Sequence, residues 1–323
     1  MYDRGLFILE QYGLEPISTK KGRGILLYET ADGWISISEY GGTKQKLELQ
    51  EVLMEHLAQT GFFCLDRMKR TSAGELLSHD REENNYIVRE WHAGRECDVR
   101  SVTDIERAAG TLANLHNHMH MEVQKEYEKE SLIEECSRHN AQIKKVKRLI
   151  LKRKRKNLFE VNVLSCVDCF LEQALETTAR LRESQYLALR EKSLEAGEVC
   201  HGEYTQHHVL FSGNLTMVTN FEHWNFDSQI ADLYQFMRKI LEKHNWDLAI
   251  GTGILETYQK VRPLSQAELC HLKLRLSYPW KFWKLLNYYA SNNKVWISGK
   301  NVEKLRQIQT QIPYWTNFLK NGF

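Results

Sequence analysis

The chain has 323 residues, of which 42% are hydrophobic and 27% are charged, and its formal net charge is +2. This composition is typical of a folded globular protein that is long enough for two lobes, each with its own core. The nearly balanced charge gives no general reason to expect nucleic acid or a membrane surface as a partner. No run of about 18 apolar residues occurs, so we expect no membrane-spanning helix.

The N-terminus and the cysteines indicate a reducing compartment. The first 13 residues, MYDRGLFILEQYG, lack a basic region and a small-residue cleavage site, so we expect no signal peptide. Seven scattered cysteines, an odd number, favour reduced thiols in a cytosol. Cys166 and Cys169 have the spacing of a metal or redox pair. No second such pair is present, so buried cysteines on a helix are the better interpretation.

The first ninety residues predict a small β-rich region with one packed helix. Alternating and helical apolar patterns give a helix at 3–14, strands at 25–30 and 34–40 around an Asp-Gly turn, a helix at 44–60, and strands at 62–68 and 84–91. Gly22 and Gly24, before the first strand of the hairpin, fit either a loop over a phosphate group or a plain turn. A lone Gly-x-Gly is weak evidence, so we favour the turn.

After residue 94 the pattern becomes helical, apart from residues 200–222. Ser101 or Thr103 can cap a helix that runs to residue 120. Amphipathic helices are expected at 230–244, 247–261 and 269–290. The aromatic residues between Tyr278 and Trp296 fit a platform for a sugar or base. Packing within the core of a large helical lobe and between its helices is the interpretation we favour.

Residues 144–156 form a basic run with nine cations in thirteen residues. Such a cluster can bind an anionic polymer. The alternative, which we favour, is a solvated helical face with Val146, Leu149 and Ile150 turned inward. Both interpretations stay open at this point.

Residues 200–222 predict two short strands joined by a turn at 212–214. His201 and Glu203 lie in the loop before the first strand, and Asn220 and Glu222 lie at the end of the second. Polar groups that converge at strand ends on a compact hairpin suit a metal–phosphate site. An ordinary hairpin with polar ends is an equally good explanation of the spacing alone.

The motifs of this hairpin resemble a known superfamily. Residues 201–210, HGEYTQHHVL, resemble the H-G-D-x-x-x-x-N-V-L catalytic loop of aminoglycoside phosphotransferase and choline kinase-like enzymes. Residues 219–222, TNFE, stand where those enzymes carry I-D-F-D or I-D-F-E, and Asp232 with Leu233 matches the D-L pair that follows. Within this superfamily the chain is similar to the CotS-like spore-coat proteins of endospore-forming bacteria. The supporting stretches are residues 90–97, 112–116 and 278–284.

The resemblance implies an α+β, two-lobed protein kinase-like fold. We expect a small β-rich N-lobe at residues 1–92 and a larger, mostly helical C-lobe at residues 93–323, which carries the degenerate catalytic-loop hairpin at 200–222. The resemblance also implies synthesis in the mother-cell cytoplasm and assembly into the spore coat with other coat proteins. The resemblance does not imply a specific nucleic acid as a partner.

The catalytic positions of the superfamily are altered in this chain. Its enzymes use a strand lysine on the phosphates, a loop Asp as base, and a loop Asn and a D-F-G-like Asp as metal ligands. The resemblance places Ser38 at the lysine position, Glu203 at the base position, and His208 and Asn220 at the metal positions. His201 keeps the backbone turn of the loop.

Three further residues receive roles from the resemblance. Glu90 and His92, beside a hinge at residues 92–94, would bind a nucleotide if one binds, and Asp232 would support the catalytic loop structurally. A unit charge pair at about 4 Å contributes about 4 kcal/mol at an effective dielectric of about 20, so we expect the replacement of a Mg²⁺-binding carboxylate by an amide to cost several kcal/mol of metal affinity. We therefore expect a pseudokinase with no required cofactor and at most weak binding of ATP and Mg²⁺.

Two other functions remain open. One is an active phosphotransferase on a small molecule or coat component, with Glu203 as base and Glu222 or His208 as a surrogate metal ligand. The other is a binding module that uses the basic run 144–156 on an anionic polymer.

Overall fold

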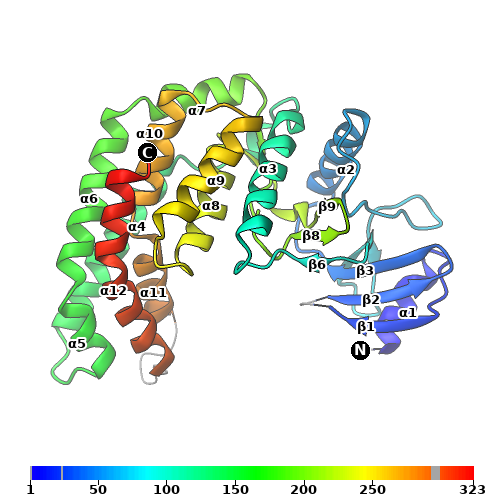
Figure 1. Ribbon diagram of the computed structural model, residues 1–323. Coiled ribbons are helices and arrows are strands. Elements are labelled where there is room, and N and C mark those ends of the chain that lie inside the picture. Colours follow the sequence, from blue (N-terminus) through cyan, green and yellow to red (C-terminus); the bar gives the residue numbers. More distant parts are fainter. Residues whose placement is uncertain (1, 23–24, 292–298) are drawn as a thin grey trace. The chain divides into compact units, whose positions relative to one another are not determined.

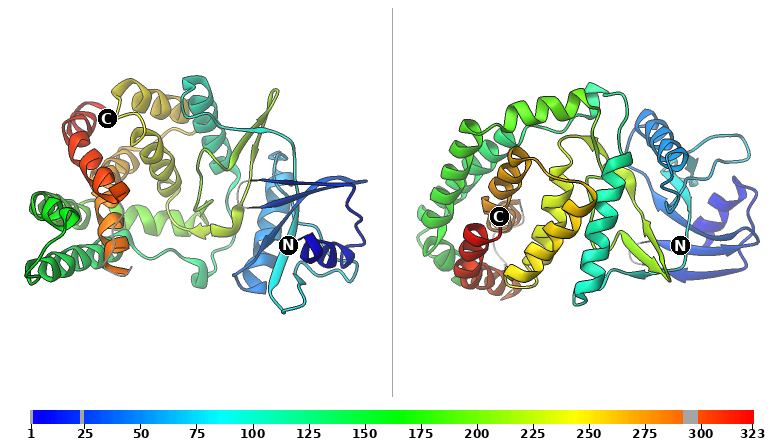
Figure 2. Two further views of the ribbon diagram at one scale, coloured as in Figure 1. Left: turned by 90° about the horizontal axis from the view of Figure 1, so that it is seen from below. Right: turned by 45° about the horizontal axis from the view of Figure 1, so that its top comes forward.

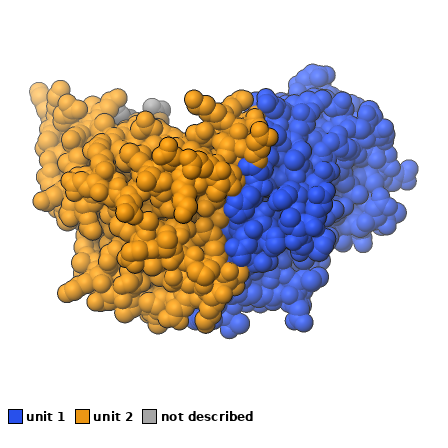
Figure 3. All heavy atoms as spheres, turned by 90° about the horizontal axis from the view of Figure 1, so that it is seen from above, with its two compact units in different colours: residues 1–121, 199–224 blue, residues 122–198, 225–323 orange. Residues whose placement is uncertain are grey.

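The computed structural model describes residues 2–22, 25–291 and 299–323 (Figure 1). Contacts within the chain divide it into two compact units, coloured separately in Figure 3. Unit 1 combines residues 1–121 with 199–224, and unit 2 combines 122–198 with 225–323. The central hairpin thus belongs to the same compact unit as the N-terminal sheet. The expected lobe boundary between residues 92 and 93 stays a prediction.

Unit 1 contains most of the strands and three α-helices of the described chain. Its elements are α1 (Tyr2–Glu10), β1 (Ser18–Lys21), β2 (Leu26–Thr30), β3 (Gly33–Glu39), α2 (Lys44–Gln59), β4 (Ser78–His79), β5 (Asn85–Glu90), β6 (Arg95–Glu96), α3 (Val102–His118), β7 (Val199–Cys200), β8 (Val209–Ser212), β9 (Leu215–Val218) and the 3₁₀-helix η2 (Phe221–His223). The expected N-terminal helix, hairpin and second helix are confirmed.

A five-stranded antiparallel sheet in the order β1-β2-β3-β5-β4 forms one part of unit 1 (Figure 2). Because side chains alternate along a strand, each face of the sheet has its own partner. One face packs Tyr28, Ile35 and Val88 against α1. Gly5 permits this close approach, since a Cβ there would lie 1.8 Å from the hydroxyl of Tyr28. On the opposite face, Ile87 packs against Leu47 of α2.

The prediction of a strand at residues 62–68 is wrong. The carbonyl of Cys64 accepts a hydrogen bond from the backbone of Val218, 3.1 Å away on β9, whereas Lys69 donates to the carbonyl of Val88 on β5, 2.8 Å away. The segment therefore passes from the edge of one sheet to another and pairs with each at a single point. A continuous ladder, which a strand needs, cannot form along it.

The predicted central hairpin is confirmed as β8 and β9, with β6 added on the other side of β8. Ser212 pairs with Leu215, so the turn consists of Gly213 and Asn214. Gly213 has a φ of +55°, in a region that residues with a Cβ seldom adopt.

Unit 2 is almost entirely helical. Its elements are η1 (Lys125–Tyr127), α4 (Leu132–Leu151), α5 (Leu158–Leu164), α6 (Val167–Glu183), α7 (Tyr186–Glu195), β10 (Asn225–Phe226), α8 (Ile230–Leu241), α9 (Leu248–Val261), α10 (Gln266–Ser277), α11 (Trp280–Ser291) and α12 (Gly299–Asn321). The helix α4 packs against both α6 and α11. No helix in the described part of the chain is both long and apolar enough to cross a membrane.

Aromatic residues near the C-terminus serve mainly in packing, as the sequence suggests. The ring of Phe282 stacks on that of Phe170 at a centroid distance of 4.3 Å, and Trp246 lies 5.4 Å from Trp315. Trp296 and Gly24 lie outside the described residues.

The interpretations of the basic run and of the cysteine pair each need a correction. Val146 and Ile150 are buried, but Leu149 is 38% exposed, because a period of 3.6 residues turns it away from their side of α4. The helix also ends at Leu151, so the last five residues of the run are not part of it. Similarly, Cys166 is buried whereas Cys169 is exposed.

Candidate functional site

The loop before β8 is held by a buried histidine. The ring Nδ1 of His201 accepts a hydrogen bond from the backbone N–H of Glu203, 3.2 Å away, so its Nε2 carries the proton and donates to the carbonyl of Thr219 at 3.0 Å. Because His201 is buried and Phe221 packs on its ring, this side chain fixes the loop against the end of β9. Its role here is structural.

Three of the predicted site residues come together beside this loop. The Nδ1 of His208 lies 2.8 Å from the carbonyl oxygen of Glu203, so Nδ1 carries the proton and Nε2 is an acceptor. The amide nitrogen of Asn220 lies 3.3 Å from that Nε2 and 3.4 Å from Oε2 of Glu203. Two acceptors thus face the amide N–H₂ group, and one network joins Glu203, His208 and Asn220.

The backbone of Asn220 has an unusual conformation that suits its residue type. Its φ of 67° and ψ of 61° lie in the left-handed region, which Asn and Asp tolerate better than other residues with a Cβ. Its N–H donates to Oδ2 of Asp66 at 2.9 Å. A buried carboxylate from the 62–68 segment therefore sets the position of the amide.

A cation from the neighbouring strand reaches Ser38, the residue predicted to stand at the lysine position. Ser36 on β3 pairs with Arg89 on β5, so the side chains of Ser38 and Arg89 lie on the same face of the sheet. The Nη1 of Arg89 donates to Oγ of Ser38 at 3.3 Å, and Nη2 forms an ion pair with Glu222. The Nε lies 3.9 Å from Oδ2 of Asp66. Arg89 is only 4% exposed.

Burial dominates the electrostatics of this group, which we call the cleft cluster: Arg89, Asp66, Glu222 and Ser38. Burial raises the pKa of Asp66 to about 6, although Arg89 and the N–H of Asn220 act in the opposite direction. Oδ1 of Asp66 and Nε of Arg89 are buried without a hydrogen-bond partner. The charges of Arg89 and Asp66 are therefore paired, but not all of their buried polar atoms have a hydrogen-bond partner.

A cavity of about 610 Å³ adjoins the cleft cluster within unit 1. Ser38 and Glu222 line it together with Lys21, Arg4 and Tyr86. Arg4 lies 3.2 Å from both Asp80 and the hydroxyl of Tyr86, so its guanidinium already has partners within the protein. Lys21 lies at the end of β1, on the cavity wall.

The remaining predicted residues are Glu90, His92 and Asp232. Glu90 alternates with Arg89 along β5, so its side chain belongs to the α1 face of the sheet. His92 is exposed beyond the end of β5. Asp232 is buried on α8 of unit 2. Their expected roles stay predictions.

Sequence reasoning missed Arg89 and Asp66. Each stands in an apolar run, YIVRE and FFCLDRM, where a charged side chain has to be buried. Buried charges require a partner of opposite sign, which was the available signal. The sequence does not identify those partners, since Arg89 and Glu222 are separated by 133 positions.

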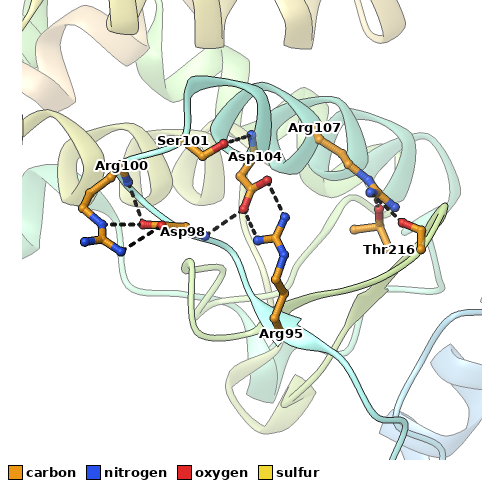
Figure 4. Close-up of polar contacts among 8 residues, drawn as sticks. Arg95, Asp98, Arg100, Ser101, Asp104, Arg107 and Thr216 are labelled. Carbon is orange, nitrogen blue, oxygen red and sulfur yellow. Dashed lines mark hydrogen bonds and ion pairs between the residues drawn. The ribbon is translucent and has the colours of Figure 1, made fainter.

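A second polar group fixes the hairpin and the start of α3 (Figure 4). Nε of Arg107 donates to Oγ1 of Thr216 at 2.7 Å, and its Nη1 donates to the carbonyl of Gly213 at 3.0 Å. Its guanidinium also lies 4.6 Å above the ring of Phe211. Through these contacts α3 holds both strands of the hairpin.

The N-terminal turn of α3 is built from Arg95, Asp98, Ser101 and Asp104, which we call the α3 cluster (Figure 4). Oγ of Ser101 caps the helix by accepting from the N–H of Asp104 at 3.2 Å. The carboxylate of Asp104 accepts from Nη2 of Arg95 at 2.9 Å and from the N–H of Asp98 at 3.0 Å. Hydrogen bonds from Arg95 and this backbone N–H lower the pKa of Asp104 to about 2.

Comparison with known proteins identifies the family. The family model described as "Spore coat putative kinase YutH" matches residues 6–322. The chain belongs to this family. The sequence-based resemblance to spore-coat proteins with a kinase-like fold is therefore confirmed. No curated protein matches the sequence.

Solved structures with the same fold are phosphotransferases of the kinase-like superfamily. An aminoglycoside phosphotransferase from Alicyclobacillus acidocaldarius subsp. acidocaldarius DSM 446 has a TM-score of 0.86 at 17% identity, covering 97% of this chain and 93% of the other. The spectinomycin phosphotransferase APH(9)-Ia, in complex with ADP and spectinomycin, has a TM-score of 0.63 at 10% identity, covering 98% and 93%. Choline kinase LicA from Streptococcus pneumoniae has a TM-score of 0.53 at 14% identity, covering 98% and 100%. The fold is thus α+β and kinase-like.

The residues at the metal positions fit Mg²⁺ poorly. Mg²⁺ prefers oxygen ligands in octahedral geometry. Here the amide of Asn220 turns its N–H₂ group toward Glu203 and His208, and His208 offers a nitrogen. Among the described residues, no group of three or more His, Cys, Asp or Glu side chains could hold a metal ion.

Proposed function

We propose that the protein is a catalytically inactive, kinase-fold component of the spore coat that acts by binding other coat proteins. The family match supports the coat association. The observation that carries the loss of activity is the cleft cluster, in which Arg89 is bound to Glu222 and Asp66 beside Ser38.

The cleft cluster opposes binding of nucleotide phosphates. Phosphoryl transfer depends on a cation that is free to bind the phosphates and on metal ions that neutralise developing charge. For Arg89 to serve as this cation, it would have to leave Glu222 and Asp66. Removing one partner from a buried ion pair costs about 3–5 kcal/mol, because the other charge stays buried and unpaired. This cost lowers the affinity for a triphosphate.

The network around Asn220 opposes metal binding in the same way. Its amide N–H₂ group satisfies Glu203 and His208 internally. A metal ion would have to displace these hydrogen bonds and would gain no carboxylate at residue 220. We therefore propose that neither ATP nor Mg²⁺ is a required cofactor.

The test is a titration of the full-length protein with ATP, with and without Mg²⁺, together with an assay of radiolabelled phosphate release and transfer. We expect no Mg²⁺-dependent turnover above background and at most weak nucleotide binding. The variant Ser38→Lys/Glu203→Asp/His208→Asn/Asn220→Asp should recover some nucleotide binding, whereas Asn220→Asp alone should restore little. Wild-type turnover that disappears in Asn220→Ala would refute the proposal.

An active phosphotransferase is the second candidate. Two observations favour it: the side chain of Glu203 is 36% exposed next to Asn220 and His223, and Lys21 lines the same cavity as Ser38. Glu203 would then be the base. If wild type transfers phosphate, loss of this activity in both Glu203→Gln and Lys21→Gln would support this assignment.

Binding of an anionic polymer by the basic run 144–156 remains a further proposal for partner recognition. Arg153 pairs with the buried Glu160 and donates to the hydroxyl of Tyr289 at 3.3 Å, so it supports the fold. The exposed cations Lys152, Lys154 and Arg155 are the residues to test. Lys152→Gln/Lys154→Gln/Arg155→Gln should weaken polymer binding and its salt dependence without lowering the melting temperature.

A further inference from the structure

The helices α8, α11 and α12 of unit 2 line a strongly basic cavity of about 520 Å³. We call it the basic cavity. This volume lies in the range of small-ligand sites, about 300–1,000 Å³. Among the described residues, six cationic side chains and a single carboxylate, Glu242, line it. The cations are Arg238, Lys239, Lys281, Lys284, Lys300 and Lys304.

Two of these cations are held in place by a tryptophan. The guanidinium of Arg238 lies 4.2 Å from the ring centroid of Trp280, and Nζ of Lys284 lies 4.8 Å from the same ring. Cation–π contacts at such distances fix the direction of a charged side chain. The cations are therefore pre-organised, which reduces the entropy lost when a ligand binds. Because the indole already binds two cations, it is a poor platform for an aromatic base.

The single carboxylate cannot neutralise the basic cavity. Glu242 lies 2.8 Å from Nη1 of Arg238 and 3.6 Å from Nζ of Lys281, so two cations share it. Within the described residues, Lys284, Lys300 and Lys304 form no ion pair with a carboxylate. The like charges that line the basic cavity repel each other, and a bound anion would relieve this repulsion.

We propose that the basic cavity binds a small compound that carries several phosphate groups. Lysine ammonium groups act as point charges on phosphate oxygens, and an arginine adds directional N–H donors. A ligand with one carboxylate would leave most of the cations unneutralised. The basic cavity lies wholly within unit 2, whereas the cleft cluster lies in unit 1, so this site does not depend on whether the cleft binds ATP.

The experiment is calorimetric titration of the full-length protein with sodium tripolyphosphate at low and at physiological ionic strength. We expect saturable binding to one site, weaker at the higher ionic strength. Lys284→Gln/Lys304→Gln should weaken binding at least tenfold. Arg306→Gln is the matched control, because Arg306 is exposed on α12 two positions from Lys304 and points to a different face of the helix. It should change the affinity less than twofold.

Further controls distinguish binding at the basic cavity from binding elsewhere on the protein. The variant Lys152→Gln/Lys154→Gln/Arg155→Gln removes more positive charge from the same unit but should leave tripolyphosphate binding unchanged. Citrate, a tricarboxylate of similar charge, should bind more weakly than tripolyphosphate. Melting temperatures with and without ligand check that each variant folds, and Lys300→Gln replaces the double variant if that one does not.

Three results would overturn the proposal. They are absence of saturable binding by wild type, an equal loss in Arg306→Gln, and an equal loss in the triple variant of the basic run. The last two would show that binding follows total charge and not the basic cavity.

Discussion

The α3 cluster and the cleft cluster use the same chemistry in opposite environments. In the α3 cluster, Arg95 is 60% exposed, and the carboxylate of Asp104 accepts N–H donors from a side chain and from the backbone. Its pKa falls to about 2. In the cleft cluster, Arg89 and Asp66 are both buried, and the pKa of Asp66 rises to about 6.

The difference shows that the effect of an arginine on the pKa of a paired carboxylate, and the contribution of the pair to stability, depend on the surroundings. Where side-chain and backbone N–H groups donate to the carboxylate, its charged form is favoured even though Asp104 is buried. Where burial removes water, the attraction of the arginine offsets only part of the desolvation cost. The α3 cluster therefore stabilises a helix terminus. The cleft cluster instead holds buried charges whose hydrogen bonding is incomplete.

The largest expected effect comes from removing the central cation of the cleft cluster. Arg89→Met leaves Asp66 and Glu222 without their cation, so the free energy of unfolding should fall by about 3–5 kcal/mol. Arg95→Met, the matched change in the α3 cluster, should cost less, because Arg95 is 60% exposed and Asp104 keeps the hydrogen bond from the N–H of Asp98. Urea unfolding of both variants at pH 7 measures the contrast. Equal losses would contradict the comparison.

A smaller effect is expected in the pH dependence of stability. The pKa of Asp66 is about 6 in the folded protein, above its ordinary value of 3.8, so the folded state holds this proton more tightly. The contribution of Asp66 should therefore lower the free energy of unfolding as pH rises from about 4 to about 6, by at most about 1.4 kcal/mol per pH unit. Asp66→Asn should remove this fall.

Asp104 should behave in the opposite way. Its folded pKa of about 2 lies below 3.8, so its stabilising contribution is complete above pH 4 and is lost as pH falls toward 2. Asp104→Asn should remove that acid-side loss and leave the range from pH 4 to 6 unchanged. Urea unfolding across a pH series measures both variants. The comparison fails if both carboxylates act over the same pH range.

The smallest effect concerns an arginine within α3, Arg107, and one just before it, Arg100. Arg107→Met removes the hydrogen bonds to Thr216 and Gly213 and should cost about 1 kcal/mol of unfolding free energy. Arg100→Met is the control, since Arg100 is 86% exposed and pairs with Asp98 at the surface. It should leave the urea midpoint unchanged. A loss in the control as large as that in Arg107→Met would show that the hairpin contacts contribute little.

Elements with a local cause were predictable from the sequence. The two hairpin turns, at residues 31–32 and 213–214, the helical spacing of Leu47, Leu53 and Leu57, and the Ser101 cap of α3 each depend on residues a few positions apart. The prediction for residues 62–68 failed because their apolar pattern is typical of a strand, whereas their backbone pairs with two different sheets at single points. The choice between these outcomes depends on neighbours that are distant in the sequence.

By itself, the sequence determined the kinase-like fold, the central hairpin, and the substitutions at Ser38, Glu203, His208 and Asn220. Their local patterns and motif positions are sufficient for that. Only the tertiary structure decided what surrounds these positions. It brought Arg89 to Ser38 and Glu222, and Asp66 to Asn220. The physical reason is that a buried charge has to be neutralised by whichever partner the fold brings near, and no local pattern in the chain encodes that partner.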